Sequence, residues 1–229
     1  MSINNIIKRA PVVIIGIPAL IGFTLYTHDV FMVFFTIAGI LILGEAYRMS
    51  RPNGTEPNIW VGYLIYLALV GDQLLGGGEN LGPILIVSIL ILLTWEMFRK
   101  QAHVMENVAS TFFAATFIAM AMSYFILLQQ LGYMGQGGHL GGYAVLTVFV
   151  GVWTCDSLAY FVGSAIGKHK IFPRVSPNKS WEGSIAGLIG SFLALLLIVR
   201  VGWLPGLDYT DALILGLITG VAGQIGDFA

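Results

Sequence analysis

Four basic residues close together and two acidic residues in apolar surroundings are the part of this sequence best suited to chemistry. The basic residues fall within twelve positions of the run KHKIFPRVSPNK and account for four of the eleven Lys and Arg in the chain: Lys168, Lys170, Arg174 and Lys179. Asp156 precedes this run inside an apolar stretch, and Asp227 lies in GQIGDFA near the end of a later one. Cationic side chains bind phosphates, and Mg²⁺ binds to carboxylates together with phosphate oxygens. The pattern therefore points to phosphoryl or nucleotidyl transfer on a lipid headgroup, with a metal offsetting the developing charge.

The segment VSPNKSWEG contains a helix-start signal. Ser176 fits the N-cap and Pro177 the first helical position. A helix that begins there would direct unpaired N–H groups and a partial positive charge toward an anion. The same stretch offers hydrogen-bonding, interfacial and small residues that we expect to contact a substrate: Asn178, Ser180, Trp181 and Gly183.

Each of these residues also has a purely structural interpretation. The basic loop would serve as a positively charged anchor on one side of a membrane, with Trp181 at headgroup level. Asp156 would be explained by a hydrogen bond between helices, although acidic residues at membrane depth usually face a polar interior or a substrate path. Other acidic residues have a local explanation, since Glu96 lies within a turn of Arg99 and Glu45 lies three residues before Arg48.

Composition identifies the broad class of protein. Hydrophobic residues make up 57% of the chain, charged residues only 10%, and the mean hydropathy is +0.85. These values are typical of an all-α polytopic membrane protein and not of a soluble globular domain. A formal net charge of −1 gives no indication of nucleic-acid binding, and the single cysteine, Cys155, cannot form an internal disulfide.

Apolar windows of roughly 20 residues, the length that spans a bilayer core, predict the helices that must position the candidate residues. We expect about eight transmembrane helices, the first two of them short and forming a tight hairpin or a partly re-entrant pair. The windows are Pro11–Thr27, Val30–Gly44, Asn58–Leu75, Leu81–Phe98, Val108–Leu128, Gly141–Ile166, Gly183–Trp203 and Asp211–Asp227.

The distribution of basic residues predicts which ends of these helices share a side of the membrane. With both termini inside, ten of the eleven Lys and Arg residues fall on the inner side and only Arg200 falls on the outer side. We therefore expect a multi-pass protein of the cell (inner) membrane, N-in and C-in, with its site facing the cytoplasm. Residues 1–229 are expected to form one membrane domain, with N-terminal helices in 1–140 and the candidate motifs in 141–229.

Four motifs in the last third of the chain resemble the phosphatidate cytidylyltransferase family, also called CDP-diacylglycerol synthases. They occur in the family's order, and the first 140 residues resemble the family only as a multi-span apolar segment. The family pattern runs approximately W-x-x-D-x-x-A-Y-x-x-G, G-K-x-K, S-P-K-K-[ST]-W-E-G and G-D-x-x-E-S. The matching segments here are WTCDSLAYFVG (153–163), GKHK (167–170), SPNKSWEG (176–183) and GQIGDFA (223–229).

The resemblance implies transfer of CMP from CTP to phosphatidate, giving CDP-diacylglycerol and pyrophosphate, with Mg²⁺ as cofactor. It implies that Asp156, Lys179 and Asp227 are catalytic and that Asp227 ligates the metal. We expect the substrate-binding set to comprise the basic residues and the SPNKSWEG loop: Lys168, Lys170, Arg174, Ser176, Asn178, Ser180, Trp181, Glu182 and Gly183.

Two departures from the family pattern bear on activity. Asn178 replaces the usual first lysine of the pair, which removes one charge but keeps a hydrogen-bond donor. The family's closing H-G-G…D-R-x-D motif, which carries a second metal-binding Asp, does not occur in the sequence. We therefore expect either a truncated version of a longer enzyme or a degenerate relative, and in both cases the activity of these 229 residues alone is in doubt.

Two other functions remain open from the residues alone. A multi-pass ion or solute transporter could use Asp156 and Asp227 as ion ligands, although the polar residues cluster at one membrane face. A CTP-dependent enzyme acting on another lipid would need the same phosphate-binding residues.

Small residues recur at a spacing of four late in the chain, as at Gly183 and Gly187, and would permit a homodimer.

Overall fold

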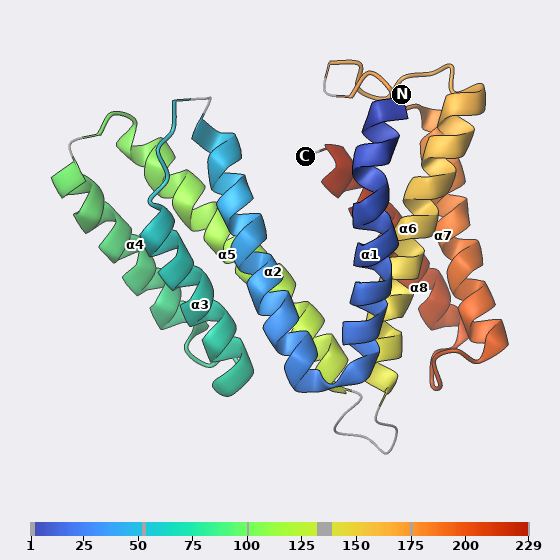
Figure 1. The fold of residues 1–229 in the computed structure, drawn as a ribbon, viewed down its shortest axis with the longest axis horizontal. Coiled ribbons are helices and arrows are strands. Elements are labelled where there is room, and N and C mark those ends of the chain that lie inside the picture. The colour runs from blue at the N-terminus through green and yellow to red at the C-terminus, as the bar shows by residue number, and fades with distance from the viewer. Residues whose placement is uncertain (1–2, 52–53, 100, 132–138, 175, 229) are drawn as a thin grey trace. The chain divides into compact units, whose positions relative to one another are not determined.

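The computed structural model describes residues 3–51, 54–99, 101–131, 139–174 and 176–228, with the side chains of 3–14 and 228 left aside. Its described residues form eight helices (Figure 1): α1 (Ile3–Tyr26), α2 (His28–Ser50), α3 (Ile59–Leu75), α4 (Leu81–Arg99), α5 (Val104–Leu131), α6 (Leu140–Ile166), α7 (Trp181–Val201) and α8 (Tyr209–Phe228). Each predicted window overlaps one of these helices. The all-helical prediction is therefore confirmed over the described part of the chain.

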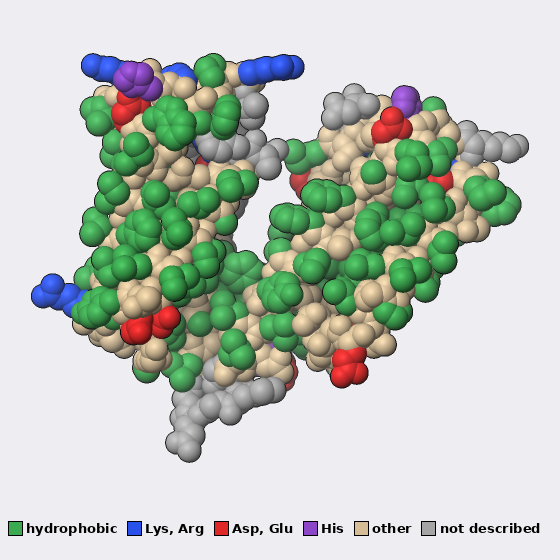
Figure 2. All heavy atoms as spheres, turned by 180° about the vertical axis from the view of Figure 1, so that it is seen from behind, with side chains coloured by type: hydrophobic (Ala, Val, Ile, Leu, Met, Phe, Trp, Pro, Cys, Tyr) green, Lys and Arg blue, Asp and Glu red, His purple; other side chains and the backbone are tan. Residues whose placement is uncertain are grey.

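Five of the helices are long and apolar enough to span a bilayer: α2, α4, α5, α6 and α7. Apolar side chains cover the sides of the helices, whereas many of the charged side chains lie toward the helix ends (Figure 2). A surface that is apolar along the helices and polar at their ends fits a membrane protein. The number of spans and their orientation remain predictions, and Lys100 and the side chains of Lys8 and Arg9 lie outside the described residues.

The chain divides into two compact units, which we call unit 1 (residues 1–25 and 131–229) and unit 2 (residues 26–130). Unit 1 contains α1, α6, α7 and α8. Helix α1 approaches α6 closely, because a Cβ on Gly142 would lie 2.6 Å from the backbone oxygen of Thr24. No sequence pattern indicated that α1 would pack with the C-terminal helices.

Unit 2 contains α2, α3, α4 and α5 and has its own hydrophobic core. Leu43, Ile65, Leu92 and Ala119 belong to this core, one from each helix. Tyr47 and Tyr66 are fully buried, and their hydroxyl groups donate to the backbone oxygens of Thr111 (2.9 Å) and Thr36 (3.1 Å). A buried hydroxyl that donates to a main-chain oxygen avoids the cost of an unpaired polar group in an apolar interior.

Helices α1 and α2 are longer than their predicted windows, with 24 and 23 residues. Thr27 separates them and caps α2, because its side chain accepts a hydrogen bond from the Val30 amide at 3.4 Å. Helix α2 continues past its apolar part as far as Ser50, and within this extension Glu45 and Arg48 form an ion pair of 3.7 Å. Hydropathy alone misses such a polar extension of a helix.

Candidate functional site

The candidate site is built on the close packing of α6 against α7 in unit 1. A Cβ on Gly183 would lie 2.6 Å from the backbone oxygen of Ala159 and 2.9 Å from the Cα of Gly163. One turn further along α7, a Cβ on Gly187 would lie 2.7 Å from the backbone oxygen of Cys155. Only glycine permits backbones to approach this closely in an apolar environment. Gly183, which we expected to contact a substrate, therefore packs against α6.

The basic loop between α6 and α7 is held by backbone hydrogen bonds and has little regular structure. Lys170 and Ser180 form an isolated antiparallel bridge, and the Ile171 amide donates to the Lys179 oxygen at 3.2 Å. The Trp181 amide donates to the oxygen of His169 at 2.9 Å. These contacts join the two ends of the loop, so the residues of GKHK lie beside those of SPNKSWEG.

The predicted helix start at Ser176 is wrong, because α7 begins at Trp181 and its N-cap is Ser180. Ser180 has extended backbone angles (φ −127°, ψ 154°), and its hydroxyl accepts from the Gly183 amide at 3.3 Å. Ser176 instead begins a turn in which its oxygen accepts from the Lys179 amide at 3.3 Å. Proline suits the second position of such a turn as well as it suits the first position of a helix.

This correction changes how an anion would be bound. The first amides of α7 already have partners within the protein, since Trp181 donates to His169 and Gly183 donates to Ser180. The expected cradle of unpaired N–H groups after Ser176 therefore does not form. Binding of a phosphate at this loop would depend on the lysine side chains.

One group of predicted site residues forms a charged cluster that joins the loop to α6 and α8. The Lys179 ammonium lies 2.8 Å from a carboxylate oxygen of Asp227 near the end of α8. Asp156, half-buried within α6, is close enough to interact electrostatically with both Lys179 and Asp227. Three residues that are distant in the sequence, and that we predicted to be catalytic, are thus brought together.

A second group lines an open hollow outside the start of α7. Its lining residues are Lys168, His169, Lys170, Pro173, Trp181, Glu182 and Ile185. Lys168, Lys170 and Trp181 are exposed, and the Lys170 ammonium donates to the backbone oxygen of Asn178 at 3.4 Å. This hollow therefore presents positive charge next to an aromatic ring at a helix end.

The remaining predicted site residues lie outside both groups or have a structural role. Arg174 is exposed and is absent from the lining of the hollow. Ser176 closes the turn, Ser180 caps α7 and Gly183 packs against α6. Glu182 accepts from the His169 amide at 3.2 Å, and its carboxylate lies 2.6 Å from Nδ1 of the His169 ring.

Two residues with clear roles at the site escaped sequence reasoning. His169 is the variable position of GKHK, yet its amide and ring both bond to Glu182 and so fasten the loop to the first turn of α7. Gln224, three residues before Asp227, donates to the backbone oxygen of Ser184 at 2.8 Å and thereby ties α8 to α7. A polar residue one turn before the acid in an otherwise apolar segment was the available signal for Gln224.

The cluster supplies part of what a magnesium ion needs. Among the described residues, no group of three or more His, Cys, Asp or Glu side chains is arranged to hold a metal. Asp156 and Asp227 nevertheless place two carboxylates in one cluster, and Asp227 is exposed. Mg²⁺ commonly binds one or two carboxylates and takes its other ligands from substrate phosphates and water. These residues therefore fit a magnesium ion that arrives with a phosphate substrate.

Comparison with known proteins identifies relatives over nearly the whole chain. The model of the cytidylyltransferase family matches residues 7–229. A phosphatidate cytidylyltransferase of Bacillus subtilis (strain 168) is 33% identical over 193 residues, covering 82% of this chain and 69% of that protein. One of Staphylococcus aureus (strain COL) is 28% identical over 209 residues, covering 86% and 73%. One of Haemophilus influenzae (strain ATCC 51907 / DSM 11121 / KW20 / Rd) is 35% identical over 105 residues, covering 44% of this chain and 36% of that protein.

Proposed function

The chain belongs to the cytidylyltransferase family, and on that premise we propose that it transfers the CMP group of CTP to phosphatidate. The products are CDP-diacylglycerol and pyrophosphate. The structural observation that carries the proposal is the ion pair between Lys179 and Asp227, which lies within electrostatic range of Asp156. The family match favours this enzyme over a transporter that would use the same two acids, and it favours phosphatidate over another lipid acceptor.

The proposed reaction balances without a general base. An oxygen of the phosphatidate phosphate attacks the α-phosphorus of CTP, forming a new P–O–P linkage. The bond between the α- and β-phosphates breaks, and pyrophosphate leaves with its electron pair. Phosphatidate is already an anion near neutral pH, so the chain's residues need to position the two phosphates and offset their charge.

The lysines of the hollow and the lysine of the charged cluster would bind different phosphates. Lys168 and Lys170 are exposed and would attract and hold the outer phosphates of CTP in the hollow. Lys179 is partly buried and paired with Asp227, so it would act on the phosphates that react. Trp181, exposed at the start of α7, suits the level of the lipid headgroups, where phosphatidate is found.

A magnesium ion would be held by Asp227, with Asp156 beside it, and when bound it would supply positive charge to the phosphates. Asp227 is paired with Lys179 in the protein as described. Binding of metal and substrate would therefore require Lys179 to shift from the carboxylate toward a phosphate oxygen. The ion pair holds both side chains near the place where they would be used.

The proposal extends to the surroundings of the site. All eight helices would cross the membrane with both termini inside, which places the basic loop in the cytoplasm, where CTP is found. Small residues on the late helices would allow two copies to pair as a homodimer. Neither the orientation nor the pairing is needed for the chemistry to occur.

The test is the incorporation of label from [α-³²P]CTP into lipid by detergent-solubilised protein with phosphatidate and Mg²⁺. It is run on this chain and on a version extended through the family's closing motif. Asp227→Asn should lower the rate by about 10²- to 10³-fold, the usual effect of removing one charged group from such a site. Asp211→Asn, an exposed residue in the first turn of the same helix, should leave the rate unchanged. Absence of labelled lipid with both forms, each folded and monodisperse, would contradict the proposed activity.

A further inference from the structure

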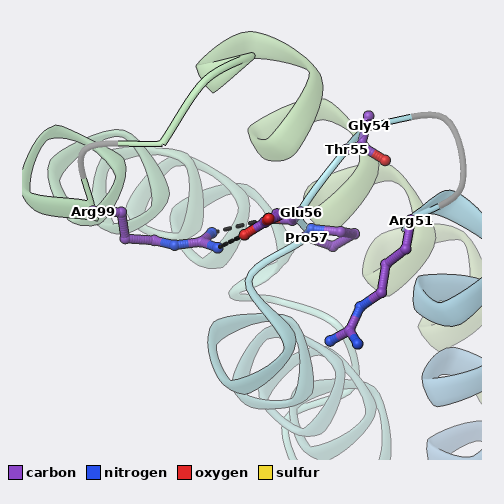
Figure 3. Close-up of a pocket in the computed structure, with 6 residues that line it drawn as sticks. All are labelled: Arg51, Gly54, Thr55, Glu56, Pro57 and Arg99. Atoms are coloured by element: carbon purple, nitrogen blue, oxygen red, sulfur yellow. Dashed lines mark hydrogen bonds and ion pairs between the residues drawn. The ribbon is translucent and has the colours of Figure 1, made fainter.

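A second cationic pocket lies in unit 2, far along the sequence from the site just described (Figure 3). It is a cavity of about 340 Å³ between the segment that leads into α3 and the end of α4. Two arginines and a short stretch of loop line it: Arg51, Gly54, Thr55, Glu56, Pro57 and Arg99. Neither the proposed reaction nor the predicted site residues account for this pocket.

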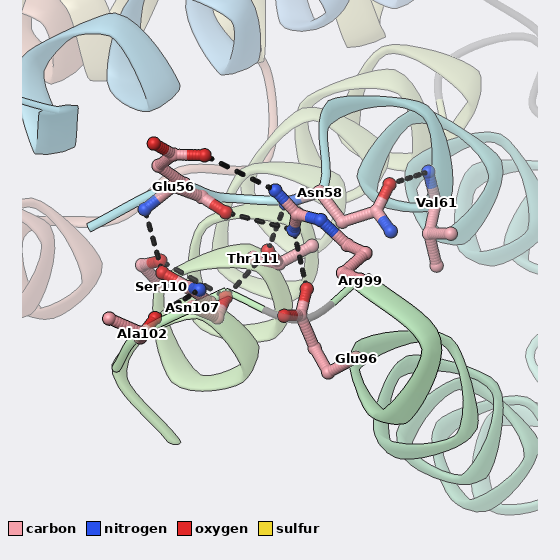
Figure 4. A network of polar contacts seen from close by, with 9 residues as sticks. All are labelled: Glu56, Asn58, Val61, Glu96, Arg99, Ala102, Asn107, Ser110 and Thr111. Carbon is pink, nitrogen blue, oxygen red and sulfur yellow. Dashed lines mark hydrogen bonds and ion pairs between the residues drawn. The ribbon is translucent and has the colours of Figure 1, made fainter. Parts of the chain in front are cut away.

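Arg99 is fixed in place by partners on two sides (Figure 4). Its guanidinium donates to the carboxylate of Glu96, whose side chain is only 1% exposed, and to the backbone oxygen of Glu56 at 3.0 Å. The Glu96 carboxylate balances the charge of Arg99 from below the surface. Arg99 therefore presents a donor group to the pocket in a fixed position. If its side chain moved away, the buried Glu96 carboxylate would be left unpaired.

The loop wall of the pocket is equally well anchored. The Glu56 amide donates to the side-chain oxygen of Asn107 at 2.6 Å, and the Asn58 amide donates to the hydroxyl of Thr111 at 2.8 Å. Asn107 and Thr111 are both buried in α5. Hydrogen bonds from the buried side chains of Asn107 and Thr111 thus hold the main chain of this wall against α5 (Figure 4).

Arg51 supplies a second, uncommitted charge on the opposite wall. Its side chain is exposed and extends along the pocket, across from Glu56 and Pro57 (Figure 3). Among the described residues, no hydrogen bond or ion pair involves its guanidinium. Among the described lining residues the one acidic side chain is Glu56, which is 58% exposed and 3.8 Å from Arg99. Solvent weakens so long a pair, so Glu56 competes only modestly for the arginines.

Two tryptophans place the pocket at the level of lipid headgroups. Trp60 is the second residue of α3 and Trp95 lies one turn before Arg99 on α4, and both rings are exposed. Exposed tryptophans on membrane helices collect at the boundary between headgroups and acyl chains. A phospholipid beside unit 2 would thus hold its phosphate at about the depth of Arg51 and Arg99.

We propose that this pocket binds a phosphate group, supplied by an anionic phospholipid of the surrounding membrane. Arg51 and Arg99 would each donate to the phosphate oxygens, which is the geometry that guanidinium groups favour. Free phosphate has the same chemistry and is the alternative source of the ligand.

An apolar groove favours the lipid over free phosphate. It has a volume of about 310 Å³ and runs between α3, which starts at the pocket, and α4, which ends at it. Ile91 on α4 lines the groove and lies eight residues before Arg99, about 12 Å along the helix. An acyl chain in this groove would leave room for a glycerol backbone between the groove and the arginines.

The test measures retention of phosphatidylglycerol by native mass spectrometry of the delipidated full chain. Phosphatidylglycerol is not the proposed substrate, so the result is independent of the activity proposed above. Arg51→Gln should weaken binding of this lipid about fivefold, the usual contribution of one cation near a membrane surface. Glu56→Gln should tighten it, because the competing carboxylate is lost while its main-chain hydrogen bonds remain. Arg48→Gln, an exposed arginine on α2 that does not line the pocket, is the matched control.

Opposite changes in Arg51→Gln and Glu56→Gln would support the proposal, since a purely structural effect would not reverse sign. Phosphatidylcholine with the same acyl chains should be retained more weakly, because its headgroup already balances its phosphate. Retention of inorganic phosphate at millimolar concentration, weakened by Arg51→Gln, without retention of phosphatidylglycerol would identify free phosphate as the ligand and overturn the lipid source. Equal retention by wild type and all three variants would overturn the site.

Discussion

Lys179 in unit 1 and Arg99 in unit 2 are paired with carboxylates in opposite ways. In unit 1, Lys179 comes from a loop and meets Asp227 from another helix, with side-chain exposures of 25% and 55%. In unit 2, Arg99 meets Glu96 from the same helix, and that carboxylate is 1% exposed. An exposed pair between two elements can be opened by a substrate at small cost. A pair with a buried partner cannot, because separation leaves a charge in an apolar interior.

The burial of a charged group and of its partner, more than the sign of the charge, therefore distinguishes a candidate catalytic residue from a structural one. Under the proposed function Lys179 would turn to a phosphate, and its partner Asp227 would then be satisfied by solvent or metal. Arg99 is committed to the fold, and only its outer N–H groups and its neighbour Arg51 remain for a ligand. The two regions should therefore respond differently to loss of the cation.

The largest effect is expected for Lys179→Met. If Lys179 offsets charge on the reacting phosphates, its loss should lower kcat/KM for CTP by about 10³-fold, or ~4 kcal/mol of transition-state stabilisation. The midpoint of thermal unfolding should change little, because the pair with Asp227 is partly exposed. The measurement is label transfer alongside a melting curve.

Lys170→Met is the matched control for that experiment. Lys170 is exposed in the same loop, and among the contacts described its ammonium group bonds only a backbone oxygen. We expect a smaller effect, about tenfold and mainly in KM, as for a residue that attracts substrate. Equal losses in the two variants would remove the distinction between the reacting and the outer phosphates.

The next largest effect is expected for Arg99→Leu, and it should appear in stability. The variant leaves Glu96 buried without its partner, which costs about 3–5 kcal/mol in comparable pairs. Arg48→Leu breaks the exposed pair with Glu45 and should cost less than about 0.5 kcal/mol. SDS-induced unfolding of the purified protein compares the two. An Arg99→Leu protein as stable as wild type would contradict the claim that the ion pair in unit 2 is structural.

How much of this arrangement could be predicted depends on whether a feature is local. Each apolar window corresponds to a helix because bilayer-length apolar runs have few alternatives. The convergence of Asp156, Lys179 and Asp227 was also indicated, since all three lie toward the same predicted membrane face. The pairing of Glu96 with Arg99 followed from their spacing on one helix.

The features that could not be predicted from the sequence are contacts between residues that are distant in it. Ser176 and Ser180 both fit an N-cap, and the choice is made by the bridge between Ser180 and Lys170, which no local pattern reveals. The division into two units is likewise a matter of which helix packs on which, as with Gly142 against Thr24. The prediction of a single domain that divides near residue 140 stays a prediction.

Gly183→Ala tests whether stability and activity depend on the close packing of α6 and α7 in unit 1, as stability is expected to depend on the buried Glu96 carboxylate in unit 2. Gly183→Ala would place a Cβ 2.6 Å from the Ala159 oxygen, so α6 and α7 must move apart. We expect a loss of about 2 kcal/mol in unfolding free energy, typical of overpacking, and reduced label transfer. Gly22→Ala in α1, where no atom lies within 4 Å of the new Cβ, should show neither. A normal Gly183→Ala protein would contradict the packing of α6 on α7.

The smallest expected effect is the difference in unfolding free energy between Ser180→Ala and Ser176→Ala, which replace the two serines that fit the N-cap of α7 by sequence. Ser180→Ala removes the hydroxyl that accepts from the Gly183 amide, and loss of an N-cap costs about 1 kcal/mol. Ser176→Ala keeps the backbone oxygen that closes the turn and should change the unfolding free energy by less than about 0.5 kcal/mol. SDS-induced unfolding resolves this difference when both variants are measured together. A larger loss in Ser176→Ala would mean that α7 starts where the sequence pattern placed it, and that its first amides are available to an anion after all.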